Sequence, residues 1–145
     1  MSRKINVLLV DDSRTVLAQL ERVLSEIEDL AIVGMARDGA SAIRMAAESK
    51  PDLVLLDIVM PGLDGLSALR TIKSLNPNVE VAMVTSVGGD SRKAEEAFRL
   101  GACQVIAKPF DADLVEGVVE TVRANRVDDP ASDEEADEEQ AGGSN

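Results

Sequence analysis

The stretch LVLLDIVMPGLDG, residues 53–65, places a carboxylate inside an apolar run. Four apolar residues precede Asp57 and three follow it, before Pro61 and Gly62 end the run. A buried carboxylate loses its hydration shell, and apolar neighbours do not replace what it has lost. Asp57 must therefore meet a counter-charge, a metal ion or water, and other parts of the chain have to supply that partner.

Four further apolar runs resemble this one in length and are predicted, with it, to be strands. At least four of the five are apolar almost throughout instead of alternating, which is typical of strands covered on both faces in a parallel sheet. The five runs are INVLLV (5–10), LAIVGMA (30–36), LVLLD (53–57), VEVAMVT (79–85) and CQVIAK (103–108).

The segments between and after these runs have the spacing of amphipathic helices. Gly101 is predicted to end the fourth helix, and Asp64 and Asp111 are predicted to cap the third and the fifth. The residues that mark the five helical faces are Val16, Leu17, Leu20, Leu24 and Ile27; Ala42, Ile43, Ala46 and Ala47; Leu66, Leu69, Ile72 and Lys73; Ala94, Ala97 and Phe98; and Leu114, Val115, Val118, Val119 and Val122.

Strands and helices that alternate over short connections predict a doubly wound α/β fold. We expect a flavodoxin-like parallel sheet of five strands, in the order 2-1-3-4-5, with five helices in three α/β/α layers. The predicted folded domain covers residues 1–127. Residues 128–145, DDPASDEEADEEQAGGSN, have almost nothing to bury and are predicted to form a disordered acidic tail.

Charge and composition exclude several classes of function. Of the net charge of −12, the tail carries eight acidic residues, which leaves −4 for residues 1–127. Neither part has the basic stripe that binds a phosphate backbone, so no nucleic-acid partner is expected. The chain contains no histidine, which excludes histidine-based acid-base catalysis, Ser-His triads and His-ligated zinc.

The single cysteine and the N-terminal apolar run predict neither a reactive thiol nor a membrane span. Cys103 is the only cysteine and lies in an apolar run, so we predict a buried structural thiol. The apolar run 5–10 ends after six residues at Asp11 and Asp12, too soon for a signal-peptide core or a membrane span. We expect a cytoplasmic protein.

Polar side chains gather where the predicted strands end. Asp11 and Asp12 follow the first strand, Asp57 ends the third, Thr85 the fourth and Lys108 the fifth. The carboxyl ends of parallel strands share one edge of the sheet, and ligands bind there at the point where strand order reverses. Three neighbouring carboxylates repel one another, and a hard divalent cation with oxygen ligands relieves that repulsion. Mg²⁺ fits this site and zinc does not.

This set of groups suits phosphoryl transfer. A carboxylate at Asp57 supplies an attacking oxygen, and Lys108, Thr85 and Mg²⁺ would stabilise the oxygens of an acyl phosphate. Taken alone, however, Asp11, Asp12 and Ser13 read equally well as the N-terminus of a helix. Lys108 and Thr85 taken alone are an ordinary lysine and an ordinary strand threonine.

Four motifs carry a family resemblance: VLLVDDS (7–13), LVLLDIVMPGLDG (53–65), AMVTS (82–86) and GACQVIAKPF (101–110). In order and spacing they resemble the receiver domain of two-component response regulators, over residues 5 to about 125. The chain is most similar to a stand-alone, CheY-like receiver. The resemblance implies a signalling switch that acts by altered protein binding and is not an enzyme, although it assists its own phosphorylation and dephosphorylation.

The resemblance also implies roles for single residues. Asp57 would be the phospho-acceptor, taking its phosphoryl group from a sensor histidine kinase or a histidine phosphotransfer protein. Asp12 would bind Mg²⁺ directly, Asp11 would help, often through water, and Asp57 and the backbone carbonyl of Val59 would complete the protein ligands. Thr85 and Lys108 would sense the phosphoryl group, and the Lys108-Pro109 bond is expected to be cis.

Two positions depart from the family pattern. Val105 stands where chemotaxis receivers usually carry an aromatic residue, so an aromatic flip cannot be the readout there. Output would instead use the face formed by the fourth helix, fifth strand and fifth helix. Val59, two residues after Asp57, is apolar and cannot hydrogen-bond a hydrolytic water, which predicts slow to moderate self-dephosphorylation.

Three other functions remain open from the sequence. A phosphate sink would drain a kinase without an output, and a degenerate receiver would bind its partner constitutively, although every acceptor-site residue is present here. A Mg²⁺-dependent phosphatase with an aspartyl nucleophile also uses an acidic pair after its first strand. That class needs a DxD arrangement there, whereas this chain has DDS at 11–13.

Overall fold

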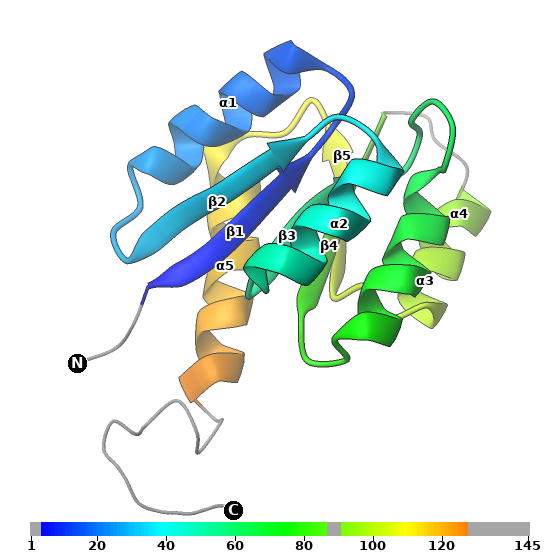
Figure 1. The fold of residues 1–145 in the computed structure, drawn as a ribbon. Helices are drawn as coiled ribbons and strands as arrows, with labels where there is room; N and C mark the ends of the chain where they lie inside the picture. Colours follow the sequence, from blue (N-terminus) through cyan, green and yellow to red (C-terminus); the bar gives the residue numbers. More distant parts are fainter. Residues whose placement is uncertain (1–3, 87–90, 128–145) are drawn as a thin grey trace, which may run out of the picture.

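The computed structural model of the protein describes residues 4–86 and 91–127. Its five strands form one parallel sheet in the order β2-β1-β3-β4-β5, and five helices alternate with them (Figure 1). This confirms the predicted fold class and strand order. The elements are β1 (Ile5–Val10), α1 (Arg14–Ser25), β2 (Leu30–Ala36), α2 (Gly39–Ser49), β3 (Leu53–Asp57), α3 (Gly65–Leu75), β4 (Glu80–Ser86), α4 (Ser91–Arg99), β5 (Gln104–Lys108) and α5 (Ala112–Val127).

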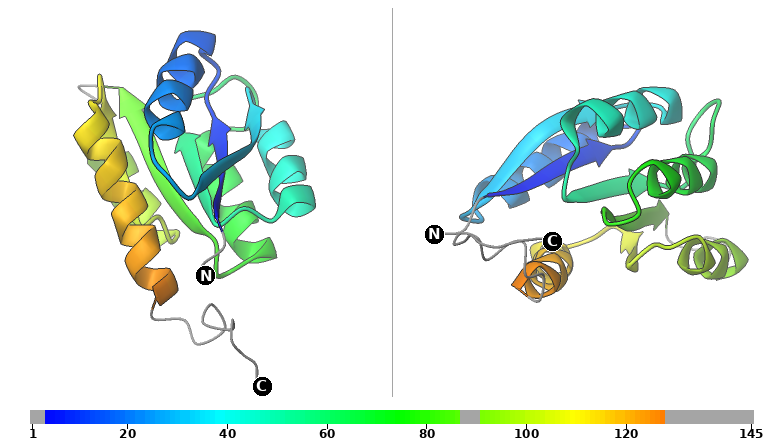
Figure 2. Two further views of the ribbon diagram at one scale, coloured as in Figure 1. Left: turned by 90° about the vertical axis from the view of Figure 1, so that its left-hand side faces the viewer. Right: turned by 60° about the horizontal axis from the view of Figure 1, so that its bottom comes forward.

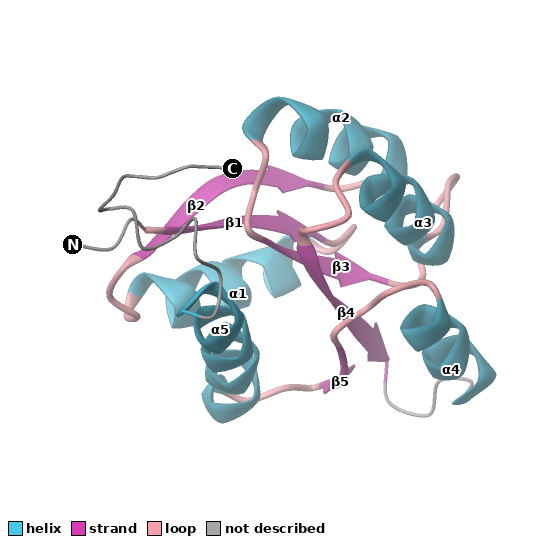
Figure 3. Ribbon diagram, turned by 90° about the horizontal axis from the view of Figure 1, so that it is seen from below, coloured by secondary structure: helices cyan, strands magenta, loops and turns pink. Residues whose placement is uncertain are grey.

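The helices cover the sheet in two layers, as the views in Figures 2 and 3 show: α1 and α5 lie on one face and α2, α3 and α4 on the other. Every residue of β3 is buried, which explains why the sequence of this central strand does not alternate. Its neighbours in sequence face opposite layers: Leu55 packs with α1 and α5, and Leu56 packs with α2 and α3. The aliphatic core therefore has two halves, one on each face of the sheet.

Side-chain caps begin the helices at the predicted positions. The carboxylate of Asp64 accepts a hydrogen bond from the backbone N–H of Ser67 at the start of α3, at 2.9 Å. Asp111 does the same for Leu114 at the start of α5, at 3.0 Å. Gly101 follows α4 with φ 109°, a left-handed conformation that glycine adopts without strain. The three predicted helix boundaries are confirmed.

Three residues assigned to the buried helical faces, Ala47, Phe98 and Leu114, are exposed instead. The exposed fraction of Phe98 is 52% and that of Leu114 is 42%. The neighbouring residues Ala97 and Val115 are fully buried and occupy the positions that face the sheet. One residue corresponds to a rotation of about 100° around a helix, so Phe98 and Leu114 point away from the core. The predictions for Ala47, Phe98 and Leu114 were wrong.

Cys103 lies just before β5 and is partly buried. Burial, with a further contribution from the charge of Glu80, raises the pKa of its thiol to about 11. The thiolate, which is the reactive form, is therefore scarce at neutral pH. This agrees with a structural role for Cys103.

The predicted acidic tail, residues 128–145, lies outside the described residues, so its disorder stays a prediction. Within residues 4–86 and 91–127, no helix has the length and apolar character needed to cross a membrane. The cytoplasmic location also stays a prediction.

Candidate functional site

The loop between β1 and α1 brings two carboxylates to the carboxyl edge of the sheet. Val10 is in register with Leu56 of β3, so Asp11 and Asp57 leave adjacent strands at the same level. Asp11 is 1% exposed, and its Oδ1 accepts a hydrogen bond from the backbone N–H of Ser13 at 2.9 Å. Asp12 is more open to solvent.

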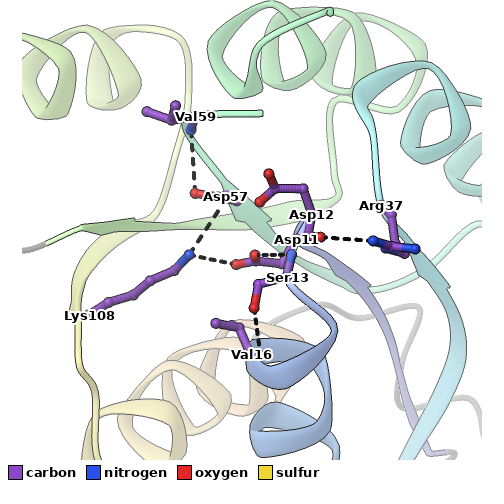
Figure 4. Close-up of polar contacts among 8 residues, drawn as sticks. All are labelled: Asp11, Asp12, Ser13, Val16, Arg37, Asp57, Val59 and Lys108. Atoms are coloured by element: carbon purple, nitrogen blue, oxygen red, sulfur yellow. Dashed lines mark hydrogen bonds and ion pairs between the residues drawn. The ribbon is translucent and has the colours of Figure 1, made fainter. Parts of the chain in front are cut away.

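Ser13 shows that this loop also begins a helix. Its hydroxyl oxygen accepts a hydrogen bond from the backbone N–H of Val16, at 3.2 Å, and caps α1. The two interpretations of the DDS sequence are therefore compatible. The serine caps the helix while the two aspartates turn toward the end of β3 (Figure 4).

Asp57 is the last residue of β3 and is 4% exposed. Its Oδ1 accepts a hydrogen bond from the backbone N–H of Val59 at 3.3 Å. The chain then folds back closely, because the backbone N–H of Gly65 donates to the carbonyl of Ile58 at 2.7 Å. The turn after β3 leaves the Val59 side chain 59% exposed beside the carboxylate.

Lys108 supplies the counter-charge from the far side of β4. It ends β5, and its Nζ lies 2.8 Å from Asp11 Oδ2 and 3.6 Å from Asp57 Oδ2 (Figure 4). Burial by itself lowers the pKa of Lys108, but the carboxylates of Asp11 and Asp57 outweigh that effect. The pKa is therefore raised above its ordinary value, and the side chain is a permanent cation at neutral pH. The peptide bond from Lys108 to Pro109 is cis, as the resemblance implies.

One lysine does not compensate this much negative charge. Burial is the main cause that raises the pKa of Asp57 to about 6, and the neighbouring charge of Asp11 raises it further. Lys108 acts in the opposite direction but does not restore the ordinary value near 3.8. The site therefore favours any bound group that adds positive charge next to Asp57.

The three aspartates fit a hard divalent cation. One carboxylate oxygen from each of Asp11, Asp12 and Asp57 lies within 4.8 Å of the other two. Asp11 Oδ2 is buried and makes an ion pair with Lys108 but no hydrogen bond within the described part of the chain. A buried carboxylate oxygen with a lone pair to spare, next to two further carboxylates, suits Mg²⁺.

Thr85 occupies the predicted edge but is not joined to the carboxylates. It is the next-to-last residue of β4, is partly buried, and is in register with Ala107 of β5. Within the described residues, 4–86 and 91–127, the Thr85 side chain makes no hydrogen bond to the aspartates or to Lys108. The structure thus brings together Asp11, Asp12, Asp57 and Lys108, and leaves Thr85 beside them.

Comparisons with known proteins match this arrangement to one family. A family model described as the response regulator receiver domain covers residues 7–120. The chain belongs to the response regulator receiver family. As a receiver, it carries its acidic cluster at the edge where β1 and β3 end, and the family places it in two-component signalling.

Several relatives of this receiver are parts of larger proteins. It is 46% identical, over 105 residues, to the protein-glutamate methylesterase/protein-glutamine glutaminase 5 of Myxococcus xanthus. That match covers 72% of this chain and 30% of the relative, and a similar protein from Caldanaerobacter subterraneus gives 42% identity over 75% and 30%. The receiver thus spans about a third of the length of these curated relatives.

Solved structures of receivers are similar along nearly their whole length. The response regulator domain of Thermotoga maritima CheB is 35% identical with a TM-score of 0.74, covering 84% of this chain and 96% of that one. A chain of the CheX–CheY–BeF₃–Mg²⁺ complex from Borrelia burgdorferi is 32% identical with a TM-score of 0.77, covering 83% and 90%.

One residue of this site, Arg37, was not predicted from the sequence. Arg37 follows β2, and its Nη2 donates a hydrogen bond to the backbone carbonyl of Asp12 at 3.3 Å (Figure 4). A single arginine after a strand carries no signal of its own. The signal that was available is its position, because β2 is predicted next to β1 and both strands end at the same edge.

Proposed function

We propose that this receiver is a phosphorylation-controlled switch in which Asp57 accepts a phosphoryl group from a phosphohistidine on a partner protein. The observation that carries the proposal is the set of groups around one buried carboxylate. Lys108 Nζ lies 3.6 Å from Asp57 Oδ2, and oxygens of Asp11 and Asp12 lie within 4.8 Å of Asp57. A structural role alone does not account for three clustered carboxylates, two of which share one lysine.

In the proposed step, an Asp57 carboxylate oxygen attacks the phosphorus atom. The new bond is an acyl phosphate, and the phosphorus–nitrogen bond of the phosphohistidine breaks. The electron pair of that bond stays on the imidazole nitrogen of the partner, which takes up a proton from solvent. Lys108 keeps its proton throughout and neutralises charge on the transferred group.

Mg²⁺ would be held by the carboxylates of Asp11, Asp12 and Asp57 and by the backbone carbonyl of Val59. When bound, it would neutralise the negative charge that builds up on phosphoryl oxygens beside Asp57. The acidic cluster described above supports this assignment, and so does the presence of Mg²⁺ and BeF₃ in the similar Borrelia burgdorferi CheX–CheY complex.

Output would follow from the transferred group. Thr85 lies one residue beyond the position that pairs with Asp57. Its hydroxyl would donate a hydrogen bond to a phosphoryl oxygen, and this bond would shift the end of β4. The adjoining face of α4, β5 and α5 exposes Phe98 and Leu114, which suits a partner that buries apolar side chains. Val105 provides no aromatic readout, so the shift would be one of backbone.

The proposed partners are a sensor histidine kinase or a histidine phosphotransfer protein, and a downstream protein that binds this face. We propose that the chain acts by binding and has no catalytic activity toward a separate substrate. The methylesterase relatives extend well beyond the part that this chain matches, so their printed activity is not carried over.

The direct test is to incubate the protein with acetyl phosphate or a phosphorylated kinase and Mg²⁺, and to measure intact mass. We expect one labile phosphoryl adduct, absent in Asp57→Asn and retained in the control Asp113→Asn, which changes an acidic residue in the first turn of α5. An adduct that persists in Asp57→Asn would contradict the proposal. Repeated turnover of small phosphate esters would favour the phosphatase instead.

A further inference from the structure

Arg37 is a cation that contacts the acidic site and makes no ion pair with a carboxylate of residues 4–86 and 91–127. Its Nη2 donates to the carbonyl oxygen of Asp12, at 3.3 Å, and the side chain is exposed to solvent. An exposed arginine beside three aspartates would ordinarily form an ion pair with one of them. This arginine binds the main chain of the loop instead, and leaves the Asp12 carboxylate turned toward Asp57 (Figure 4).

The contact continues the pairing of β2 with β1 beyond the sheet. Val10 and Ala36 form the last pair of the two strands. The backbone N–H of Asp11 then donates to the carbonyl of Ala36 at 3.1 Å. Arg37, the next residue of the same chain segment, binds the carbonyl of Asp12 through its side chain. Two consecutive residues of the acidic loop are thus fixed by two consecutive residues, the last residue of β2 and the one that follows it.

The segment that carries Arg37 is itself firmly packed. Asp38 caps α2 by accepting a hydrogen bond from the backbone N–H of Ser41 at 2.7 Å. A Cβ atom at Gly39 would lie 2.7 Å from the carbonyl oxygen of Leu63, so the loop after β3 rests directly on this glycine. Arg37 therefore projects from a fixed base that touches the loops on both sides of the acidic cluster.

We propose that Arg37 is a positioning residue that holds the main chain of Asp12 so that its carboxylate faces Asp11 and Asp57, and that this raises the affinity of the site for Mg²⁺. The inference rests on the metal site of the proposed function. It assigns Arg37 no contact with the metal or the phosphoryl group.

Electrostatic repulsion and positioning predict opposite effects of the removal of Arg37 on Mg²⁺ affinity. A positive charge close to a cation site repels the cation, so electrostatics alone predicts that removal of Arg37 tightens Mg²⁺ binding. Loss of positioning predicts the opposite, because an untethered Asp12 loop must be ordered when the metal binds. Partners that orient metal ligands typically contribute about 10- to 100-fold in affinity, and an exposed bond to main chain belongs at or below the lower end of that range.

The experiment measures Mg²⁺ affinity by titration calorimetry at fixed ionic strength. For Arg37→Ala we expect affinity weaker by about three- to tenfold, with Arg37→Lys and Arg37→Gln between it and the unmodified protein, because both retain a donor. Arg44→Ala, which removes an exposed arginine within α2, serves as the charge control and should change affinity little. The unfolding midpoint of Arg37→Ala in EDTA should equal that of the unmodified protein.

The outcomes separate this inference from the proposed function. If Arg37→Ala binds Mg²⁺ as tightly as the unmodified protein, or more tightly, the positioning role is wrong and the metal site stands. If Arg37→Gln loses as much affinity as Arg37→Ala, the retained donor does not matter and the positioning role is again wrong. If the unmodified protein binds no Mg²⁺, both the proposed metal site and this inference fail.

Discussion

The ionised carboxylate of Asp57 destabilises the folded state when no metal is bound. Its pKa is raised to about 6, chiefly by burial and then by the charge of Asp11, against an ordinary value near 3.8. Well below the ordinary pKa of 3.8 the carboxyl is protonated in both the folded and the unfolded chain, so it does not affect stability there. Between pH 4 and 6 the unfolded chain ionises first, and above pH 6 the destabilisation of the folded state is complete.

Replacement of this carboxylate should therefore stabilise the metal-free protein. In EDTA at pH 7.5 we expect Asp57→Asn to raise the free energy of unfolding by about 1–3 kcal/mol, and most of this difference should be lost at pH 4. Urea unfolding at the two pH values measures both. Saturating Mg²⁺ should then stabilise the unmodified protein much more than the variant. A variant that is less stable in EDTA at pH 7.5 would contradict this account of the site.

Val59 is the residue expected to set the lifetime of the acyl phosphate. Its side chain is 59% exposed next to the acceptor and offers no hydrogen bond to an attacking water. Val59→Asn should shorten the lifetime by about tenfold, which is less than the roughly 10²- to 10⁴-fold that a positioned general acid or base contributes. Val59→Ala removes bulk without adding a polar group, so it should change the lifetime much less. Decay of the adduct, followed by intact mass, checks both. An equal or longer lifetime in Val59→Asn would show that this position does not control hydrolysis.

At the scale of the elements, the connection from β3 to α3 depends on a glycine. A Cβ atom at Gly65 would lie 2.0 Å from the backbone oxygen of Asp57 and 2.7 Å from Cα of Ile58. Gly65→Ala must therefore displace the backbone that carries the acceptor, and we expect a loss of stability of about 1–3 kcal/mol or more. Phosphorylation by acetyl phosphate should slow as well.

Gly117 provides the matched control. It lies within α5, and a Cβ atom there would meet nothing within 4 Å. Gly117→Ala should stabilise the protein by about 0.5–1 kcal/mol, because alanine favours the helix. Denaturant unfolding of the two variants compares them directly. Equal effects of the two substitutions would show that the close approach at Gly65 carries no strain.

The elements also show where local sequence patterns are sufficient. Caps such as Asp64 and Asp111 act on residues three positions away, so sequence alone predicts them. The direction of Phe98 depends on how α4 is rotated against the sheet, and apolar spacing alone assigned it to the wrong side. Arg37 acts on Asp12, 25 positions earlier, through a contact that exists only once β2 lies beside β1.

At the scale of the whole molecule, the site could be predicted because topology gathers it. Asp11, Asp57 and Lys108 are far apart in sequence, yet each ends or follows a strand, and parallel strands share one edge. The same rule placed Thr85 at that edge but could not say whether its hydroxyl reaches a carboxylate. Contacts of single side chains depend on distances of a few ångströms, which strand order does not determine.

The folded unit is expected to end with α5. Near the end of this helix, Arg123 bonds to Asp29 at 2.9 Å and Asn125 bonds to Glu80 at 2.8 Å, so the last turns are tied to β4 and to the turn before β2. Both contacts precede residue 127. The tail that follows contributes eight acidic residues and almost no apolar surface.

A chain that ends at residue 127 should therefore be as stable as the full chain, within about 0.5 kcal/mol, because the sequence of the tail predicts a solvated segment with almost no apolar side chain to bury. Removal of the tail changes the net charge from −12 to −4, so any remaining difference in stability should shrink as salt screens the repulsion.

Truncation after Val119 is the control. It removes buried Val122 together with Arg123 and Asn125, and should lower stability by several kcal/mol, because a buried apolar side chain is lost and a cavity is left. Urea unfolding at low and high salt measures all three chains. If the chain that ends at residue 127 were less stable by more than about 1 kcal/mol at both salt concentrations, the tail would have to pack against the domain, since a solvated segment cannot have that effect.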